Sequence, residues 1–177
     1  MKETIRVEDY ANQITEALGR GILLNTKADK FNSMVIGWGH LGRIWNLPTF
    51  AVYVREGRYT KGPLDKTKEF SVSIPQGAPD AEINRICGSL SGRNIDKEKE
   101  AHLTLVEGNQ IKVPGIKEYP ITLECKVLYQ QEQDLMLLPE NLRGTFYPQD
   151  VDGTHPMANR DAHTMYIGQI VDAYIIR

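Results

Sequence analysis

The segment from Arg55 to Thr60 gathers two guanidinium groups, a hydroxyl and a glycine directly after an apolar stretch. The planar fork of arginine can donate two hydrogen bonds at once to a phosphate, and Gly57 lets the backbone turn closely around an anion. These residues could therefore hold a phosphate group. The alternative, which chemistry alone favours, is that Arg55 and Arg58 are solvated side chains at the end of a strand.

A second group of candidates lies upstream, where Asn32, Ser33 and Met34 open an apolar segment and Trp38 and Gly39 follow it. A planar heteroaromatic ring needs hydrogen-bonding partners at its edges and flat apolar surfaces against its faces. Asparagine, serine and strand N–H groups supply the first, and methionine and tryptophan supply the second. Taken alone, a Trp and a Met in a strand more often belong to the core.

His163 is the candidate for a catalytic group, because it stands at the start of the last apolar segment. The alternative is a histidine whose hydrogen bonds are satisfied at a strand end. No two histidines have the spacing of a helical metal pair, and the sequence has no HExxH, GxSxG or Walker A motif. We expect no metal site.

Gly37, Gly39 and Gly42 spell the letters GxGxxG. A dinucleotide fingerprint needs a helix that begins within the motif, whereas here Pro48 follows without a helical pattern. We therefore reject a Rossmann interpretation. Cys87 and Cys125 form no CxxC pair, and we expect Cys87 to be a small buried side chain.

The elements that must position these residues are mostly strands with period-two or β-branched patterns. We predict strands at 22–26, 31–38, 50–55, 70–75, 121–129 and 164–176, the last bent at Gly168, and short helices at 7–18, 63–68 and 80–90. We predict a loop from Gly39 to Pro48, because glycine, asparagine and proline punctuate it. The charge run from Asp96 to Glu100 is typical of a solvated surface turn or helix end.

This pattern predicts a mainly β protein with short helices, either an antiparallel barrel or a sandwich, in which residues 1–177 form a single domain. The formal net charge of -2 argues against nucleic acid as a partner. No apolar run is long enough for a membrane span, and no signal-peptide core stands at the N-terminus. We expect no membrane association and a cytoplasmic location.

Several of these motifs occur in an order that resembles the flavin reductase-like family, and within it the flavoredoxin group. The segments that carry the resemblance are 32–39, 42–45, 53–55, 58–60, 87–93 with 96–97, and 161–168. The resemblance implies an FMN-binding split β-barrel that forms a homodimer, with the flavin at or near the subunit interface. One family trait is missing, because Gln169 stands where an acidic residue is usual.

The resemblance also implies which residues contact the flavin. Asn32, Ser33 and Met34 would meet the ring, and the Arg55–Thr60 turn would hold the phosphate. The full set of predicted cofactor-binding residues is Asn32, Ser33, Met34, Val35, Trp38, Gly39, Arg55, Arg58, Tyr59, Thr60, Gly88 and Arg93. His163 is the predicted catalytic residue, near the ring or the substrate.

The function we expect is that of an FMN oxidoreductase, which accepts hydride or electrons on the flavin N5 from NAD(P)H or a protein donor. The first alternative is a flavoredoxin-type electron carrier with FMN but without its own nicotinamide site. The second is a barrel that binds a small ligand and has no redox function. A nicotinamide nucleotide or a redox protein is thus the expected partner.

Overall fold

An antiparallel sheet of eight strands forms the body of the protein, and the computed structural model describes residues 1–152 and 159–177. The strand order is β3-β2-β6-β9-β10-β5-β4, and β1 pairs with β10. The strands are β1 (Lys2–Thr4), β2 (Ile22–Lys27), β3 (Phe31–Ile36), β4 (Gly39–Ile44), β5 (Leu47–Arg55), β6 (Glu69–Ile74), β9 (Ile121–Glu132) and β10 (His163–Ile176), with β7 (Leu105–Val106) and β8 (Gly115–Ile116) in a separate pair. The prediction of a mainly β fold with short helices is confirmed.

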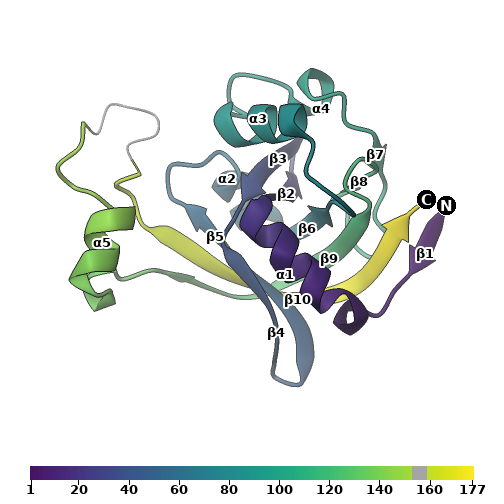
Figure 1. Cartoon of the computed structure of the whole chain (residues 1–177), viewed down its shortest axis with the longest axis horizontal. Helices are drawn as coiled ribbons and strands as arrows, with labels where there is room; N and C mark the ends of the chain where they lie inside the picture. Colours follow the sequence, from purple (N-terminus) through teal and green to yellow (C-terminus); the bar gives the residue numbers. More distant parts are fainter. Residues whose placement is uncertain (153–158) are drawn as a thin grey trace.

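Short helices cover this sheet (Figure 1). The helical elements are η1 (Val7–Tyr10), α1 (Ala11–Arg20), α2 (Lys61–Thr67), α3 (Ala81–Ser89), α4 (Lys97–Glu100), η2 (Leu135–Leu137) and α5 (Glu140–Phe146). Helix α1 buries Ile14, Ala17 and Leu18 in the main core, as its helical spacing predicts. Helices α3 and α4 pack on β3, while α5 lies at the end of the molecule away from the two termini. Within the described residues, no helix has the length and apolar character required to cross a membrane.

The segment predicted as a loop from Gly39 to Pro48 is a β-hairpin, so that prediction was wrong. Strand β4 pairs with β5, and the pairing continues to Ile44 opposite Leu47. Trp45 and Asn46 have φ angles of 51° and 59°, the positive values that a two-residue hairpin turn requires. Gly39 reflects close strand contact rather than a loop, because a Cβ there would lie 2.7 Å from the carbonyl oxygen of Ala51.

Strand β3 also ends earlier than predicted, at Ile36 rather than Trp38. The charge run from Asp96 to Glu100 also differs in part from its prediction. Asp96 caps α4 by accepting a hydrogen bond from the backbone N–H of Lys99, as a helix end should. Lys97, however, is buried, with only 4% of its surface exposed. A solvated turn was therefore the wrong interpretation for Lys97, because packing of α4 on β3 encloses it.

The pairing of β10 with β9 is irregular at Gly168, where a bend was predicted, and the bend itself stays a prediction. The register shifts between Ile167 and Gly168. A Cβ at Gly168 would lie 2.6 Å from the ring of Phe70 and 2.9 Å from the Cβ of Cys125. Both neighbours belong to the main core, so this position has no room for a side chain.

We expect Gly168→Ala to lower the free energy of unfolding by about 1–3 kcal/mol, because the added methyl group overpacks the core. Gly42→Ala is the matched control, since a Cβ there meets no atom within 4 Å and the residue also lies in a strand. Urea unfolding of the three proteins measures both effects. Equal stability of the two variants would contradict the packing argument.

Candidate functional site

A pocket of about 530 Å³ opens between β3, the turn that follows β5, and the α3–α4 segment. Its volume is that of a typical small-molecule or cofactor site, for which roughly 300–1,000 Å³ is usual. It brings together eleven of the residues predicted from the sequence: Asn32, Met34, Val35, Trp38, Arg55, Arg58, Tyr59, Thr60, Gly88, Arg93 and His163. Segments far apart in the chain thus meet at one cavity.

The other two predicted residues, Ser33 and Gly39, are absent from the pocket lining. Ser33 is fully buried behind the wall, and its carbonyl oxygen accepts a hydrogen bond from Lys97. Gly39 lies against β5 in the hairpin. Their predicted contact with the flavin stays a prediction.

The charge of the pocket has one sign. Its basic side chains are Arg55, Arg58, Arg93 and Lys97, and none of the described residues that line it is Asp or Glu. The chain as a whole has a net charge of -2, so the acidic residues lie elsewhere. This local excess of positive charge suits an anionic ligand.

The turn between β5 and α2 is held rigidly at the rim of the pocket. The backbone N–H of Gly57 donates to Oδ2 of Asp161 over 2.7 Å, and Nη1 of Arg93 donates to the carbonyl oxygen of Gly57 over 3.1 Å. Nδ2 of Asn32 donates to Oγ1 of Thr60 over 2.9 Å. These bonds join β3, the turn and the α3–α4 segment, so the backbone of the turn is fixed in place.

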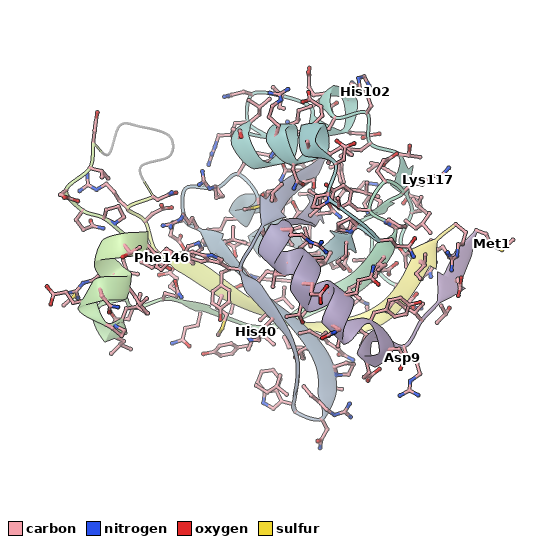
Figure 2. All side chains as sticks on the ribbon, in the orientation of Figure 1. Met1, Asp9, His40, His102, Lys117 and Phe146 are labelled. Carbon is pink, nitrogen blue, oxygen red and sulfur yellow. The ribbon has the colours of Figure 1, made fainter. Side chains whose placement is uncertain are left out.

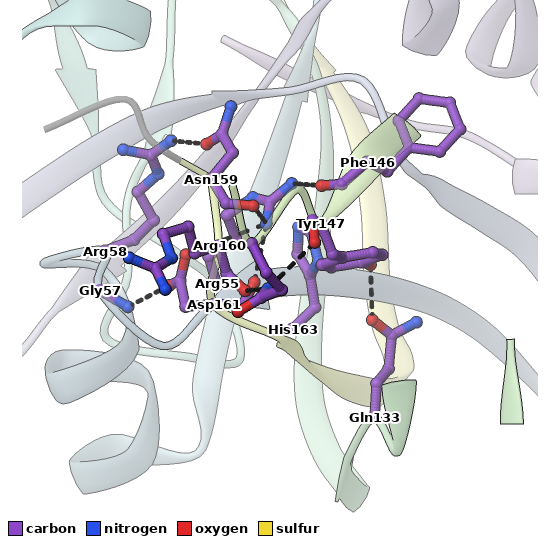
Figure 3. A network of polar contacts seen from close by, with 11 residues as sticks. Arg55, Gly57, Arg58, Gln133, Phe146, Tyr147, Asn159, Arg160, Asp161 and His163 are labelled. Atoms are coloured by element: carbon purple, nitrogen blue, oxygen red, sulfur yellow. Dashed lines mark hydrogen bonds and ion pairs between the residues drawn. The ribbon is translucent and has the colours of Figure 1, made fainter. Parts of the chain in front are cut away.

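Arg55 binds protein carbonyls rather than facing the pocket with free donors (Figure 3). Its Nη1 donates to the carbonyl oxygens of Asn159 and Asp161 over 2.9 and 2.7 Å, and its Nη2 donates to that of Phe146 over 2.8 Å. Burial lowers the pKa of Arg55, which the carboxylate of Asp161 partly offsets. Arg55 thus ties the end of α5 to the sheet, and its contact with a phosphate stays a prediction.

His163 lies opposite Arg55 in the pairing of β10 with β5. Its Nδ1 is 2.9 Å from the hydroxyl oxygen of Tyr147, which donates its own proton to Oε1 of Gln133 over 2.8 Å. A tyrosine hydroxyl has one proton to donate, so Nδ1 of His163 must carry the proton of the first bond. Nε2 is then an acceptor, and the imidazole ring lies 4.9 Å from the ring of Trp38.

The imidazole of His163 is neutral at ordinary pH. Burial lowers its pKa to about 4, and the positive charge of Arg55 contributes in the same direction. A neutral ring with its proton on Nδ1 can accept a hydrogen bond from a ligand, but it has no proton to give at Nε2.

Comparison with known proteins agrees with this arrangement. Residues 26–177 match the family model described as flavin reductase like domain. The chain belongs to this family. An uncharacterized protein from Archaeoglobus fulgidus is 31% identical over 113 residues, which are 64% of this chain and 63% of the relative.

Solved structures show that this flavin reductase-like chain has the split β-barrel fold. A flavoredoxin from Methanosarcina acetivorans is similar with a TM-score of 0.66 at 23% identity, over 89% of this chain and 69% of the other. An NADH:FAD oxidoreductase from Streptomyces globisporus has a TM-score of 0.63 at 15% identity, over 98% and 87% of the two chains. Identities this low establish the fold alone.

Several residues that line this pocket of the flavin reductase-like chain were not predicted from the sequence. Lys97 and Asn159 line it, together with Tyr53 and Cys87. Burial raises the pKa of Cys87, which agrees with its prediction as a small buried side chain. The one sequence signal for Lys97 was its position directly after Asp96, which caps α4. A run of charged residues, however, does not indicate that one of them is buried.

We expect the low pKa of His163 to make the apo-protein less stable as the pH falls from 6.5 to 4. The unfolded chain binds a proton at His163 in this window and the folded chain does not, so the unfolding free energy decreases with falling pH. The largest contribution of one such group is on the order of 3 kcal/mol. His163→Gln should remove it, whereas His102→Asn, at an exposed histidine, should not. Urea unfolding at several pH values measures this, and a wild-type slope in His163→Gln would contradict it.

Proposed function

We propose that this chain binds FMN in the pocket and is an oxidoreductase of the flavin reductase kind. The observation that carries the proposal is the pocket itself, which is lined by four basic side chains and, among its described lining residues, by no carboxylate. A dianionic phosphate is the group that such a donor set suits. Arg58 and Arg93 are the residues we propose for it, at the turn that Gly57 and Thr60 close.

The wall of the pocket also fits a ligand with hydrogen-bond donors. Oδ1 of Asn32 is buried and has no hydrogen-bond partner among the described residues, while Nδ2 of the same side chain donates to Thr60. A buried acceptor without a partner is costly, and a flavin offers a ring N–H and ribityl hydroxyls. Met34 and Trp38 supply apolar surface beside it. The residues present therefore fit FMN.

A bound flavin supplies the acceptance of hydride or electrons at N5, and the protein supplies position and charge. We propose that Trp38 and Met34 limit the access of water to the ring. His163, held by Tyr147, would present Nε2 as a fixed acceptor. With its pKa at about 4, it orients a ligand rather than protonating one.

We expect the purified protein to be yellow, and the apo-protein to bind FMN in a fluorescence titration. Arg58→Ala should weaken FMN binding by about 10- to 100-fold, the equivalent of one charge-assisted hydrogen bond of roughly 1.5–3 kcal/mol. Arg85→Ala is the control, because Arg85 is exposed and pairs with Glu82 on α3. A barrel for some other small ligand would show no visible absorbance, and Arg58→Ala would then leave its ligand affinity unchanged.

Anaerobic mixing of the FMN-loaded protein with NADH and NADPH separates the two redox functions. A reductase with a nicotinamide site bleaches the flavin absorbance within the turnover time. A flavoredoxin-type carrier stays yellow with both nucleotides and bleaches only with a reduced protein donor. Absence of bleaching would therefore contradict the reductase function and favour the carrier function, while the proposal of FMN binding would stand.

We also propose that the chain forms a homodimer. Apolar side chains on the β4–β5 hairpin and on β9 are exposed, and they form one group in which the rings of Trp45 and Tyr129 lie 6.5 Å apart. Ile44 in the hairpin and Leu128 on β9 are exposed as well. The hairpin projects from the body of the protein, and its side chains reach outwards (Figure 2). Exposed apolar groups of this kind mark protein interfaces.

Light scattering should give about twice the chain mass of 20.0 kDa. Trp45→Asn should raise the dissociation constant of the dimer at least about tenfold, because buried tryptophans dominate interface energies. The hairpin survives the change, since asparagine favours the positive φ of this turn. Lys99→Gln, on α4, is the control. A monomeric wild-type protein would contradict the proposal.

A further inference from the structure

The short helices η2 and α5 form an exposed apolar surface. They carry four large apolar side chains that are exposed: Met136, Leu137, Leu142 and Phe146. Leu142 and Phe146 are one helical turn apart and lie on the same face of α5. Nη1 of Arg143 is 3.3 Å from Sδ of Met136, so η2 lies beside α5. We call these four apolar side chains the η2–α5 patch, and a group of this kind marks a binding surface.

The η2–α5 patch reaches the rim of the pocket. The ring of Phe146 meets the ring of Trp38 edge to face, with the two centroids 5.3 Å apart. Trp38 lines the pocket and is itself exposed. The carbonyl oxygen of Phe146 accepts a hydrogen bond from Arg55, which fixes the end of α5 beside the sheet. A molecule bound on the patch would therefore lie next to the pocket, at the end of the protein away from the two termini (Figure 1).

The chain that flanks the patch is acidic. Between residues 130 and 152 five side chains are acidic and exposed, namely Glu132, Asp134, Glu140, Asp150 and Asp152. Two arginines accompany them. Arg143 is half-buried and contacts Met136, and Nη1 of Arg160 donates to the carbonyl oxygen of Val151 over 3.4 Å. The patch thus has acidic surroundings, whereas the lining of the pocket beside it is basic.

The combination of apolar surface and negative charge decides which partner fits. A second copy of the chain in a symmetric contact would bring the same acidic residues together, and like charges across an interface repel one another. Nucleic acid and the anionic surface of a membrane are repelled for the same reason. A protein that presents basic residues around an apolar surface is complementary. Because the adjacent pocket is the proposed flavin site, the partner for which this position is useful is a redox protein.

We propose that the η2–α5 patch docks a basic redox protein, which exchanges electrons one at a time with the flavin in the adjacent pocket. This proposal rests on the proposed function. Full reduction of the flavin takes two electrons, one from each of two partner molecules that are thereby oxidised, and two protons from solvent. Oxidation reverses the same balance. Encounters of this type bury less than about 1,200 Å², so a small apolar patch with a charged rim is sufficient for a short-lived complex.

The first test measures docking without electron transfer. The probe is a lysine-rich cytochrome c, and its matched control is the same protein with acetylated lysines, which have lost their positive charge. Calorimetry with the flavin-free protein at about 10 mM ionic strength should detect the unmodified probe, and the acetylated probe should bind at least about tenfold more weakly. Binding of the unmodified probe should decrease strongly at about 150 mM ionic strength, where charges are screened. Equal affinity for the two probes, or no binding of either, overturns the proposal.

Charge reversal locates the docking surface. Glu132→Lys combined with Asp150→Lys should weaken cytochrome binding at least about tenfold at low ionic strength, because both changes place like charges across the interface. Glu8→Lys combined with Glu16→Lys is the matched control, since it changes the net charge equally at exposed residues of η1 and α1. An equal loss in both double variants means that only the net charge matters, and it overturns the proposal.

The apolar part of the surface is tested at Leu137, whose side chain is among the most exposed of the patch at 83%. Leu137→Gln removes apolar contact area and should weaken cytochrome binding about three- to tenfold, whereas Leu137→Met keeps an apolar side chain and should bind as the wild type does. Light scattering on Leu137→Gln tests the rival occupant. A lower oligomeric mass than that of the wild type assigns the patch to a second copy of the chain and overturns the proposal.

The last measurement follows electron transfer from the reduced, FMN-loaded protein to ferric cytochrome c by stopped-flow absorbance. The rate should decrease with rising salt and in the Glu132→Lys, Asp150→Lys double variant. Oxidation by a small neutral quinone needs no docking surface and should have the same rate in every variant. A protein that binds no FMN overturns the proposed function and this proposal together. A yellow protein with equal rates of transfer to cytochrome c in the wild type and the double variant overturns this proposal alone.

Discussion

Three backbone carbonyl groups converge on one guanidinium, that of Arg55, and one side of the pocket depends on this interaction. The oxygens of Phe146, Asn159 and Asp161 come from the connection between β9 and β10, whose described residues have no partner in the sheet. Each accepts a charged hydrogen bond, which is stronger than a neutral one. The connection is therefore fixed to the end of β5, and His163 begins the next strand from a defined position.

Arg55, the last residue of β5, and Arg58, in the turn after it, therefore have different roles. Arg55 is enclosed and maintains the wall, whereas Arg58 stays on the pocket side with Asn159 beside it. Asp161 supports both the turn and the wall. One oxygen of its carboxylate accepts a hydrogen bond from the N–H of Gly57, and its main-chain carbonyl accepts one from Arg55. The carboxylate of Asp161 is thus used by the scaffold. The cavity itself keeps its positive charge, which raises the local concentration of anions even on a slightly acidic protein.

The sequence predicted most of the strands, because their inward faces repeat with a period of two and β9 and β10 are long. It did not predict β4, whose side chains are largely exposed on both faces, so that no alternation distinguishes it from a loop. The pocket residues near Arg58 were predicted from the order of the family-like motifs along the chain. Lys97 did not, because its burial comes from the packing of α4 on β3, and local charge patterns carry no information on such packing. The bonds of Arg55 to residues 91 to 106 positions away lay beyond any local pattern for the same reason.

Strand β10 has a second irregularity in its pairing, between Ile170 and Asp172. Before it, Tyr166 and Ile170 face the main core, and after it Ala173 and Ile175 do, so the inward positions change from even to odd numbers. The length of this strand is consequently under a constraint that its amino-acid types do not reveal. Deletion of one residue at the irregularity would restore simple alternation, whereas deletion of one residue elsewhere in the strand would turn part of it inside out. Substitutions on its outward positions are far easier to accommodate than any change of length, whereas the hairpin tip between β4 and β5 can tolerate insertions.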